Sequence, residues 1–129
     1  LYAGEMPAKA AMLAARYSRI LGVHLNDGYA KRDDGLMVAS VHEVATLELL
    51  REVHRAGFDG PIYFDTFPDA SGLDPVAECA ANIRTVRRLM AGVHAMVGDN
   101  RLTHAQSAQD PVIAQEIARL AAAEGALAA

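Results

Sequence analysis

The sequence has almost no cysteine, no long apolar run and no cluster of basic residues. Cys79 is the only cysteine, which excludes an internal disulfide or a cysteine-rich zinc site and makes a reducing cytoplasm the simplest compartment. We expect Cys79 to be a small core residue. No apolar run approaches the roughly 18 residues that span a bilayer, and the N-terminus lacks the order of a secretory signal. We therefore expect a cytoplasmic protein without a membrane partner.

Positive charge is also scarce, with 12 Lys and Arg against 16 Asp and Glu and a formal net charge of −4. The basic residues are scattered instead of forming a stripe, which argues against nucleic acid as a partner. Apolar residues make up 52% of the 129 positions, enough for one domain with a sizeable core. Because the opening LYAGE resembles the interior of a fold and no initiating Met precedes it, we expect the C-terminal portion of a larger domain.

Hydrophobic periodicity and turn residues divide the chain into alternating helices and strands. The expected helices cover residues 5–18, 41–56, 74–96 and 110–123, and the expected strands cover residues 19–25 and 62–66. Ser40 and Glu43 have the spacing of a capping box for the second helix, and Gly57 follows its end. Strands joined by a helical crossover are parallel, so the order predicts an α/β fold. Two strands are too few for a stable sheet, so other copies or a preceding segment must cover their edges.

The residues most suited to chemistry lie between positions 24 and 35, where one imidazole and three carboxylates follow the first strand. His24 ends that strand, and Asp65 ends the second. Reactive groups of parallel α/β folds gather at the C-terminal ends of strands, so we expect these two side chains to share a site. Imidazole and carboxylates together suit Mn²⁺, Co²⁺ or Zn²⁺, or Mg²⁺ when more oxygen ligands are present. A divalent metal is therefore the expected cofactor.

Simpler interpretations remain open for these residues. His24 is equally well explained as a hydrogen-bonded histidine at a strand end, and Asp65 as a turn acid. Asp33 and Asp34 also fit solvated loop acids beside two basic neighbours. The remaining histidines have no carboxylate at ligand spacing and are interpreted as surface or packing residues: His42, His54, His94 and His104.

Asn26 and Asp27 have two interpretations as well. They either shape the turn after the strand through hydrogen bonds to the backbone, or contact the metal ligands and orient them.

Three segments together resemble the xylose isomerase-like TIM-barrel superfamily: HLNDGY at 24–29, DDGLMVASVH at 33–42 and IYFDTFP at 62–68. Within it they look most similar to L-rhamnose isomerase-type and sugar phosphate isomerase/epimerase-type proteins. The resemblance covers about residues 1–96 and implies the C-terminal part of a (β/α)8 TIM barrel, about strands 7 and 8 with flanking helices, plus a C-terminal extra helix. The implied division is a barrel portion at 1–97 and a helical extension at 98–129.

By this resemblance His24 and Asp65 are ligands of a first metal, and Asp33 is a ligand of a second, with Asp34 as a weaker substitute. Mn²⁺ is the expected ion. Gly35 departs from the family pattern because some relatives carry a third acid there, which puts the second metal site in question. A bridging Glu, an Asp ending the sixth strand and a nearby His also belong to that pattern and are not found in this chain.

The implied activity is metal-dependent interconversion of an aldose and a ketose, or epimerisation next to a carbonyl, on a sugar or sugar phosphate. No catalytic side chain is assigned, and the chain alone is expected to bind metal weakly and turn over little. We expect a small sugar as the substrate and a homo-oligomer as the assembly. The alternatives are another metal-dependent reaction on the same barrel, such as an endonuclease or a dehydratase, and a non-catalytic α/β oligomerisation module using residues 110–127.

Overall fold

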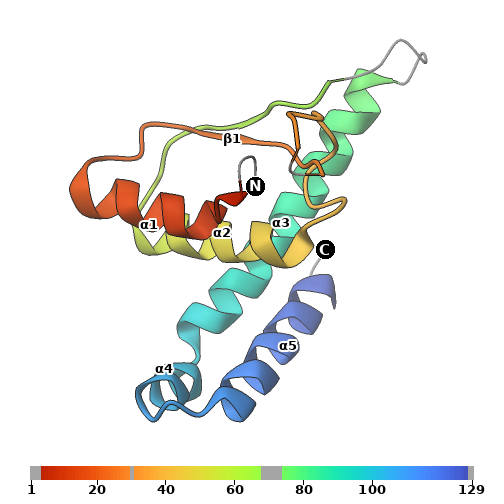
Figure 1. Ribbon diagram of the computed structural model, residues 1–129. Helices are drawn as coiled ribbons and strands as arrows, with labels where there is room; N and C mark the ends of the chain where they lie inside the picture. The colour runs from red at the N-terminus through yellow and green to blue at the C-terminus, as the bar shows by residue number, and fades with distance from the viewer. Residues whose placement is uncertain (1–3, 30, 68–73, 128–129) are drawn as a thin grey trace. The chain divides into compact units, whose positions relative to one another are not determined.

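The computed structural model describes residues 4–29, 31–67 and 74–127. In these ranges the fold is mixed α/β but mostly helical, with five helices and a two-stranded parallel sheet (Figure 1). The elements in chain order are α1 (Pro7–Tyr17), β1 (Val23–Leu25), α2 (Glu43–Arg55), β2 (Ile62–Phe64), α3 (Pro75–Gly98), α4 (Asn100–Ser107) and α5 (Pro111–Leu127). None of the described helices is both long and apolar enough to cross a membrane.

The chain divides into two compact units, Leu1–Thr85 and Val86–Ala129, and the boundary falls inside α3. These units are defined by internal contacts. The division into domains at residues 97 and 98 stays a prediction.

The sheet of the first unit pairs β1 with β2 in parallel, as the sequence predicts. Val23 lies opposite Ile62, and His24 lies opposite Tyr63. Two further bonds continue the ladder, from the Val23 amide to the Pro61 carbonyl at 3.2 Å and from the Asp65 amide to the Leu25 carbonyl at 2.9 Å. Both strands are shorter than predicted, since residues 19–22 and 65–66 are not part of a strand. Side chains alternate across the sheet, so Val23 is buried and His24 is exposed.

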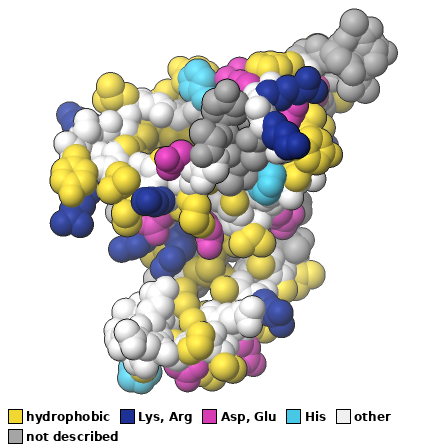
Figure 2. Space-filling model, viewed as in Figure 1, with side chains coloured by type: hydrophobic (Ala, Val, Ile, Leu, Met, Phe, Trp, Pro, Cys, Tyr) yellow, Lys and Arg dark blue, Asp and Glu magenta, His cyan; other side chains and the backbone are white. Residues whose placement is uncertain are grey.

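Helices α1 and α2 pack side by side in the first unit (Figure 1). Pro7 opens α1, where its missing N–H costs nothing. The buried side of α2 carries Leu50 and Val53. The opposite side of α1 stays at the surface with Tyr17 among its exposed side chains, and Figure 2 shows hydrophobic side chains there.

The two ends of α2 differ in how well the sequence predicts them. Gly57 ends the helix as expected, with φ +67° and its amide bonded to the His54 carbonyl. The predicted capping box of Ser40 and Glu43 is wrong. His42 is the N-cap residue, and its side chain makes no capping hydrogen bond to the helix. A carboxylate from the loop after β1 instead accepts the amides of Val41 and His42, just before the helix, as described below.

The first half of α3 holds the segment that leads into α2. Asn82 is fully buried, and its Oδ1 accepts a hydrogen bond from the Val38 amide at 3.0 Å. Val38 is buried as well. Cys79 is exposed, so its interpretation as a core residue is wrong. Its neighbours on the helix, Val76 and Ile83, are also exposed, which shows that this apolar stripe has no cover within the described part of the chain.

The second unit is built from the end of α3 together with α4 and α5. Its buried apolar residues are Leu89, Val93, Met96, Leu102, Ala105, Ile117 and Ala121. Gly92 lets α3 approach α5 closely, because a Cβ there would lie 3.2 Å from the Ala121 carbonyl oxygen. Helix α4 lies between the third and fourth predicted helices, where the sequence predicted none. Asp99 begins it by accepting the Arg101 amide at 2.9 Å.

Candidate functional site

The loop after β1 is closed at its base by two backbone hydrogen bonds. The amide of Asp27 donates to the Leu36 carbonyl, and the amide of Leu36 donates to the Asp27 carbonyl, both at 2.9 Å. This antiparallel bridge fixes the two ends of the loop next to the C-terminal end of β1. The predicted site residues of the loop therefore stay close to the sheet.

His24 and Asp65 lie together, at the ends of neighbouring strands. The distance from His24 Nδ1 to Asp65 Oδ2 is 3.9 Å, and the two side chains are 66% and 49% exposed. The Tyr63 ring packs beside the imidazole with 5.1 Å between ring centroids. A contact so open to solvent contributes little to stability. The nitrogen and oxygen donors therefore remain accessible to a ligand.

Asn26 connects this pair to the loop. Its side-chain amide donates to Asp33 Oδ1 at 2.8 Å and to the backbone carbonyl of Asp65 at 3.0 Å. Asp33 also receives a longer bond, 3.3 Å, from the Gly35 amide to the same oxygen. Asn26 thus links Asp33 to the backbone of Asp65, and the second oxygen of Asp33 has no hydrogen bond among the described residues.

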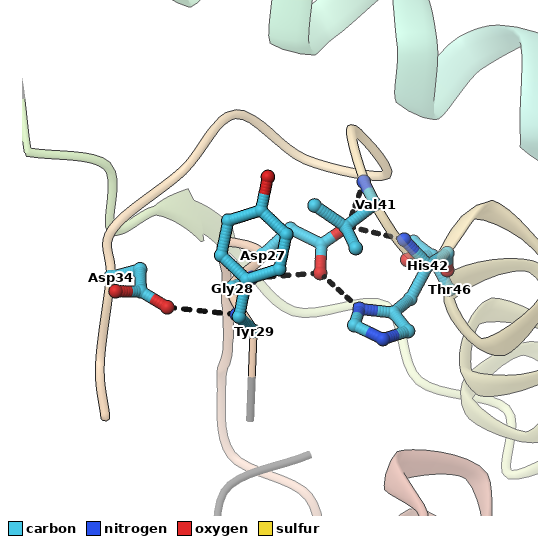
Figure 3. Close-up of polar contacts among 7 residues, drawn as sticks. All are labelled: Asp27, Gly28, Tyr29, Asp34, Val41, His42 and Thr46. Carbon is cyan, nitrogen blue, oxygen red and sulfur yellow. Dashed lines mark hydrogen bonds and ion pairs between the residues drawn. The ribbon is translucent and has the colours of Figure 1, made fainter. Parts of the chain in front are cut away.

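Asp34 is turned toward its own loop. Its Oδ2 accepts the Tyr29 amide at 2.8 Å (Figure 3). Its Oδ1 accepts Arg32 Nε at 2.7 Å. The Tyr29 amide, followed by the Arg32 guanidinium, holds the pKa of Asp34 below its usual value. Because both oxygens already have partners, Asp34 suits a metal less well than Asp33 does.

Gly35 has a steric reason to lack a side chain. Its φ is +60°, and a Cβ would overlap the ring of Phe67. The Phe67 amide also donates to the Gly35 carbonyl at 2.9 Å. The acid that some members of the resembled family carry at this position therefore cannot fit this backbone.

The most highly bonded carboxylate of the site belongs to Asp27. Its Oδ1 accepts the Gly28 amide and His42 Nδ1, each at 2.8 Å. Its Oδ2 accepts the amides of Val41 and His42 at 2.8 and 2.7 Å (Figure 3). Asp27 therefore holds the two residues that lead into α2, near the N-terminus of the helix, where the helix dipole favours a negative charge.

Burial opposes the charge of Asp27, since only 4% of its side chain is exposed. By itself burial would raise the pKa of this carboxyl, but the bonds from His42, Val41 and Gly28 outweigh it and hold the pKa below the usual 3.8. Asp27 is thus an ionised acceptor at neutral pH. The structure supports its interpretation as a residue that shapes the turn.

The prediction that His42 has no carboxylate partner is wrong. Asp27 and His42 are fifteen positions apart, and the closed loop brings them together. The sequence spacing gave no sign of this pair, because neither periodicity nor a motif connects a loop acid with a residue before the next helix. His104 is exposed, in agreement with its interpretation as a surface or packing residue.

A hollow of about 510 Å³ lies between this loop and α2. Its lining combines polar groups with an apolar wall: Pro7, Leu25, Asn26, Asp27, Gly28, Arg32, Asp33, Asp34, His42, Ala45, Thr46 and Leu49. The volume suits a small organic ligand. His42 and the candidate metal ligand Asp33 both border it.

Among the residues that the structure describes, no group of three or more His, Cys, Asp or Glu side chains is arranged to hold a metal ion. His24 and Asp65 supply one nitrogen and one carboxylate of the type that divalent metals bind, and Asp33 is linked through Asn26 to the backbone of Asp65. No protein-family model and no curated protein matches the sequence.

Proposed function

We propose that the protein is a metal-dependent isomerase or epimerase of a sugar or sugar phosphate. In this proposal β1 and β2 correspond to about the seventh and eighth strands of a (β/α)8 barrel. The observation that carries it is the meeting of His24 Nδ1 and Asp65 Oδ2, 3.9 Å apart, at the C-terminal ends of adjacent parallel strands. This is the edge at which barrel enzymes assemble their sites. The resemblance of three segments to the xylose isomerase-like superfamily supports the same proposal.

The residues present fit a divalent metal in part. His24, Asp65 and Asp33 would hold it, and the remaining ligands would come from elsewhere. When bound, such an ion polarises a carbonyl and stabilises negative charge on a sugar oxygen. Asn26 fixes the orientation of Asp33 and touches the backbone of Asp65, and such supporting contacts usually matter for metal affinity.

Mn²⁺ binding tests the proposal directly. We expect His24→Ala to weaken Mn²⁺ binding at least about tenfold, because loss of a ligand costs no less than loss of a supporting contact. Electron paramagnetic resonance of free Mn²⁺ measures the dissociation constant. His104→Ala, on an exposed position of α4, is the control. Equal affinity of His24→Ala and the unmodified chain would reject His24 as a ligand.

Asp65→Asn gives a second test at constant side-chain size. We expect it to weaken Mn²⁺ binding as His24→Ala does, because an amide oxygen carries no full charge. Asp34→Asn should weaken Mn²⁺ binding far less, since both Asp34 oxygens are already bonded within the loop. The opposite ranking of these two variants would contradict the proposed ligand set.

A further inference from the structure

The contacts of His42 fix which of its ring nitrogens is available. Asp27 accepts a hydrogen bond from Nδ1 at 2.8 Å, and an ionised carboxylate can only accept. Nδ1 must therefore carry a hydrogen, and Nε2 of the neutral ring must carry a lone pair. Nε2 has no hydrogen bond to any residue in the described part of the chain, and in Figure 3 no dashed line reaches it.

Asp27 does not need the His42 ring in order to hold the residues that lead into α2. The amides of Val41 and His42 already bond to Asp27 Oδ2, so the carboxylate would hold the start of the helix without the imidazole. The ring adds a base of fixed orientation, one-third exposed, at the wall of the 510 Å³ hollow. An acid that locks the tautomer of a histidine is the arrangement by which proteins orient a general base.

The rest of the hollow suits a small polar ligand. Leu25, Ala45 and Leu49 give the hollow an apolar wall. Asn26 and Asp33 add polar groups to its lining. Arg32 also lines the hollow, with its Nε bonded to Asp34 Oδ1 at 2.7 Å, and its other guanidinium N–H groups are donors for a ligand oxygen.

We propose that His42 is a general base that removes a proton from the carbon next to the carbonyl of an α-hydroxy aldehyde or ketone, with Asp27 as its positioning residue. The C–H bond breaks, its proton moves to Nε2, and its electron pair leaves an enediolate on the ligand. The imidazolium then returns the proton to the enediolate, so the exchange consumes no oxidant or reductant. This inference rests on the proposed function for its substrate class and assigns the proton transfer, which that function leaves open.

Deuterium exchange into dihydroxyacetone tests the proton transfer without metal. The chain is incubated with dihydroxyacetone in D2O and EDTA near neutral pH, and loss of the carbon-bound proton signal is followed by NMR. We expect protein-dependent exchange that falls about 100-fold or more in His42→Gln, in the range typical of a removed general base. His104→Gln should exchange as the unmodified chain does.

The response of Nε2 to a ligand is a readout that a merely structural role of the pair would not change. Long-range ¹⁵N–¹H spectra should show the Nδ1–H form for His42, and addition of dihydroxyacetone should shift its Nε2 resonance. Asp27→Asn should raise the fraction of the Nε2–H form and slow exchange, while the amide spectrum verifies that the fold is kept.

Three results would overturn the inference: exchange by His42→Gln within threefold of the unmodified chain, no exchange above buffer, or an Nε2–H tautomer in the unmodified chain. Failure of the proposed function looks different. It appears as Mn²⁺ affinity that does not depend on His24, and the EDTA assay does not measure that property.

Discussion

At Gly35 the backbone is left-handed, and the Phe67 ring occupies the space where a side chain would begin. Gly57 has nearly the same φ, but nothing lies within 4 Å of its Cβ position. A comparison of substitutions at Gly35 and Gly57 therefore separates the stability lost through a left-handed backbone from the stability lost through steric overlap.

We expect Gly35→Ala to lower the free energy of unfolding by roughly 2–4 kcal/mol, the sum of a left-handed penalty and overpacking. Gly57→Ala should lose only about 1 kcal/mol, since it bears the first penalty alone. Urea unfolding followed by circular dichroism measures both. Equal losses would mean that Phe67 moves away at little cost.

Asp27 makes the stability depend on pH. Its pKa in the folded protein lies below the usual 3.8, so the unfolded chain takes up the proton first as the pH falls. The stabilisation is complete above about pH 5 and is lost as the pH falls through the folded pKa.

We expect Asp27→Asn to lower the free energy of unfolding at pH 7 by about 1–3 kcal/mol, because buried amides lose an acceptor. Between pH 5 and 3 the variant should lose less stability than the unmodified chain. Urea unfolding at each pH measures the difference. Parallel curves would contradict a depressed pKa at Asp27.

Among the helices, α4 was missed although its start signal is present in the sequence. Asp99 bonds the Arg101 amide and also pairs with the Arg101 side chain at 2.6 Å. The helix is short and buries only Leu102 and Ala105, so it has little periodicity to reveal it. An aspartate before a run without Gly or Pro was the available signal.

We expect Asp99→Ala to lower the free energy of unfolding by about 0.5–2 kcal/mol, the usual loss for an N-cap acid. Asp99→Asn should retain most of the stability because its amide oxygen still accepts the Arg101 amide. Thermal unfolding followed by circular dichroism compares the two. If both variants lose the same amount, the ion pair with Arg101 matters more than the cap.

The other elements were predictable because each follows from local pattern. Pro7 and Gly57 mark helix ends by their own backbone chemistry, and the parallel pairing follows from strands separated by a helix. The meeting of His24 with Asp65 was predictable on the same ground. The Asp27 and His42 pair and the clash at Gly35 were not, since both arise when the loop closes on itself and on Phe67.

For the whole molecule, the two-stranded sheet of the first unit is the element with least support. A sheet of two strands is marginal in water, and the face with His24 and Tyr63 is exposed. The core side of α2 is far better protected, with Leu50 fully buried.

We expect the Asp65 amide, which closes the ladder, to exchange with D2O at least about tenfold faster than the Leu50 amide, because local opening is easiest where few contacts are lost. NMR hydrogen exchange measures both rates. Protection of Asp65 that rises with protein concentration would support the predicted homo-oligomer. Equal protection in dilute solution would contradict a weakly supported sheet.

The bridge between Asp27 and Leu36 has one more consequence, for how such a protein can change over time. Its two backbone bonds hold both ends of the loop whatever side chains stand between them. We therefore expect most substitutions between these two residues to leave β1 and α2 in place, provided that Gly35 is kept. New ligand preferences could arise by substitution in this short stretch while the rest of the chain stays as it is.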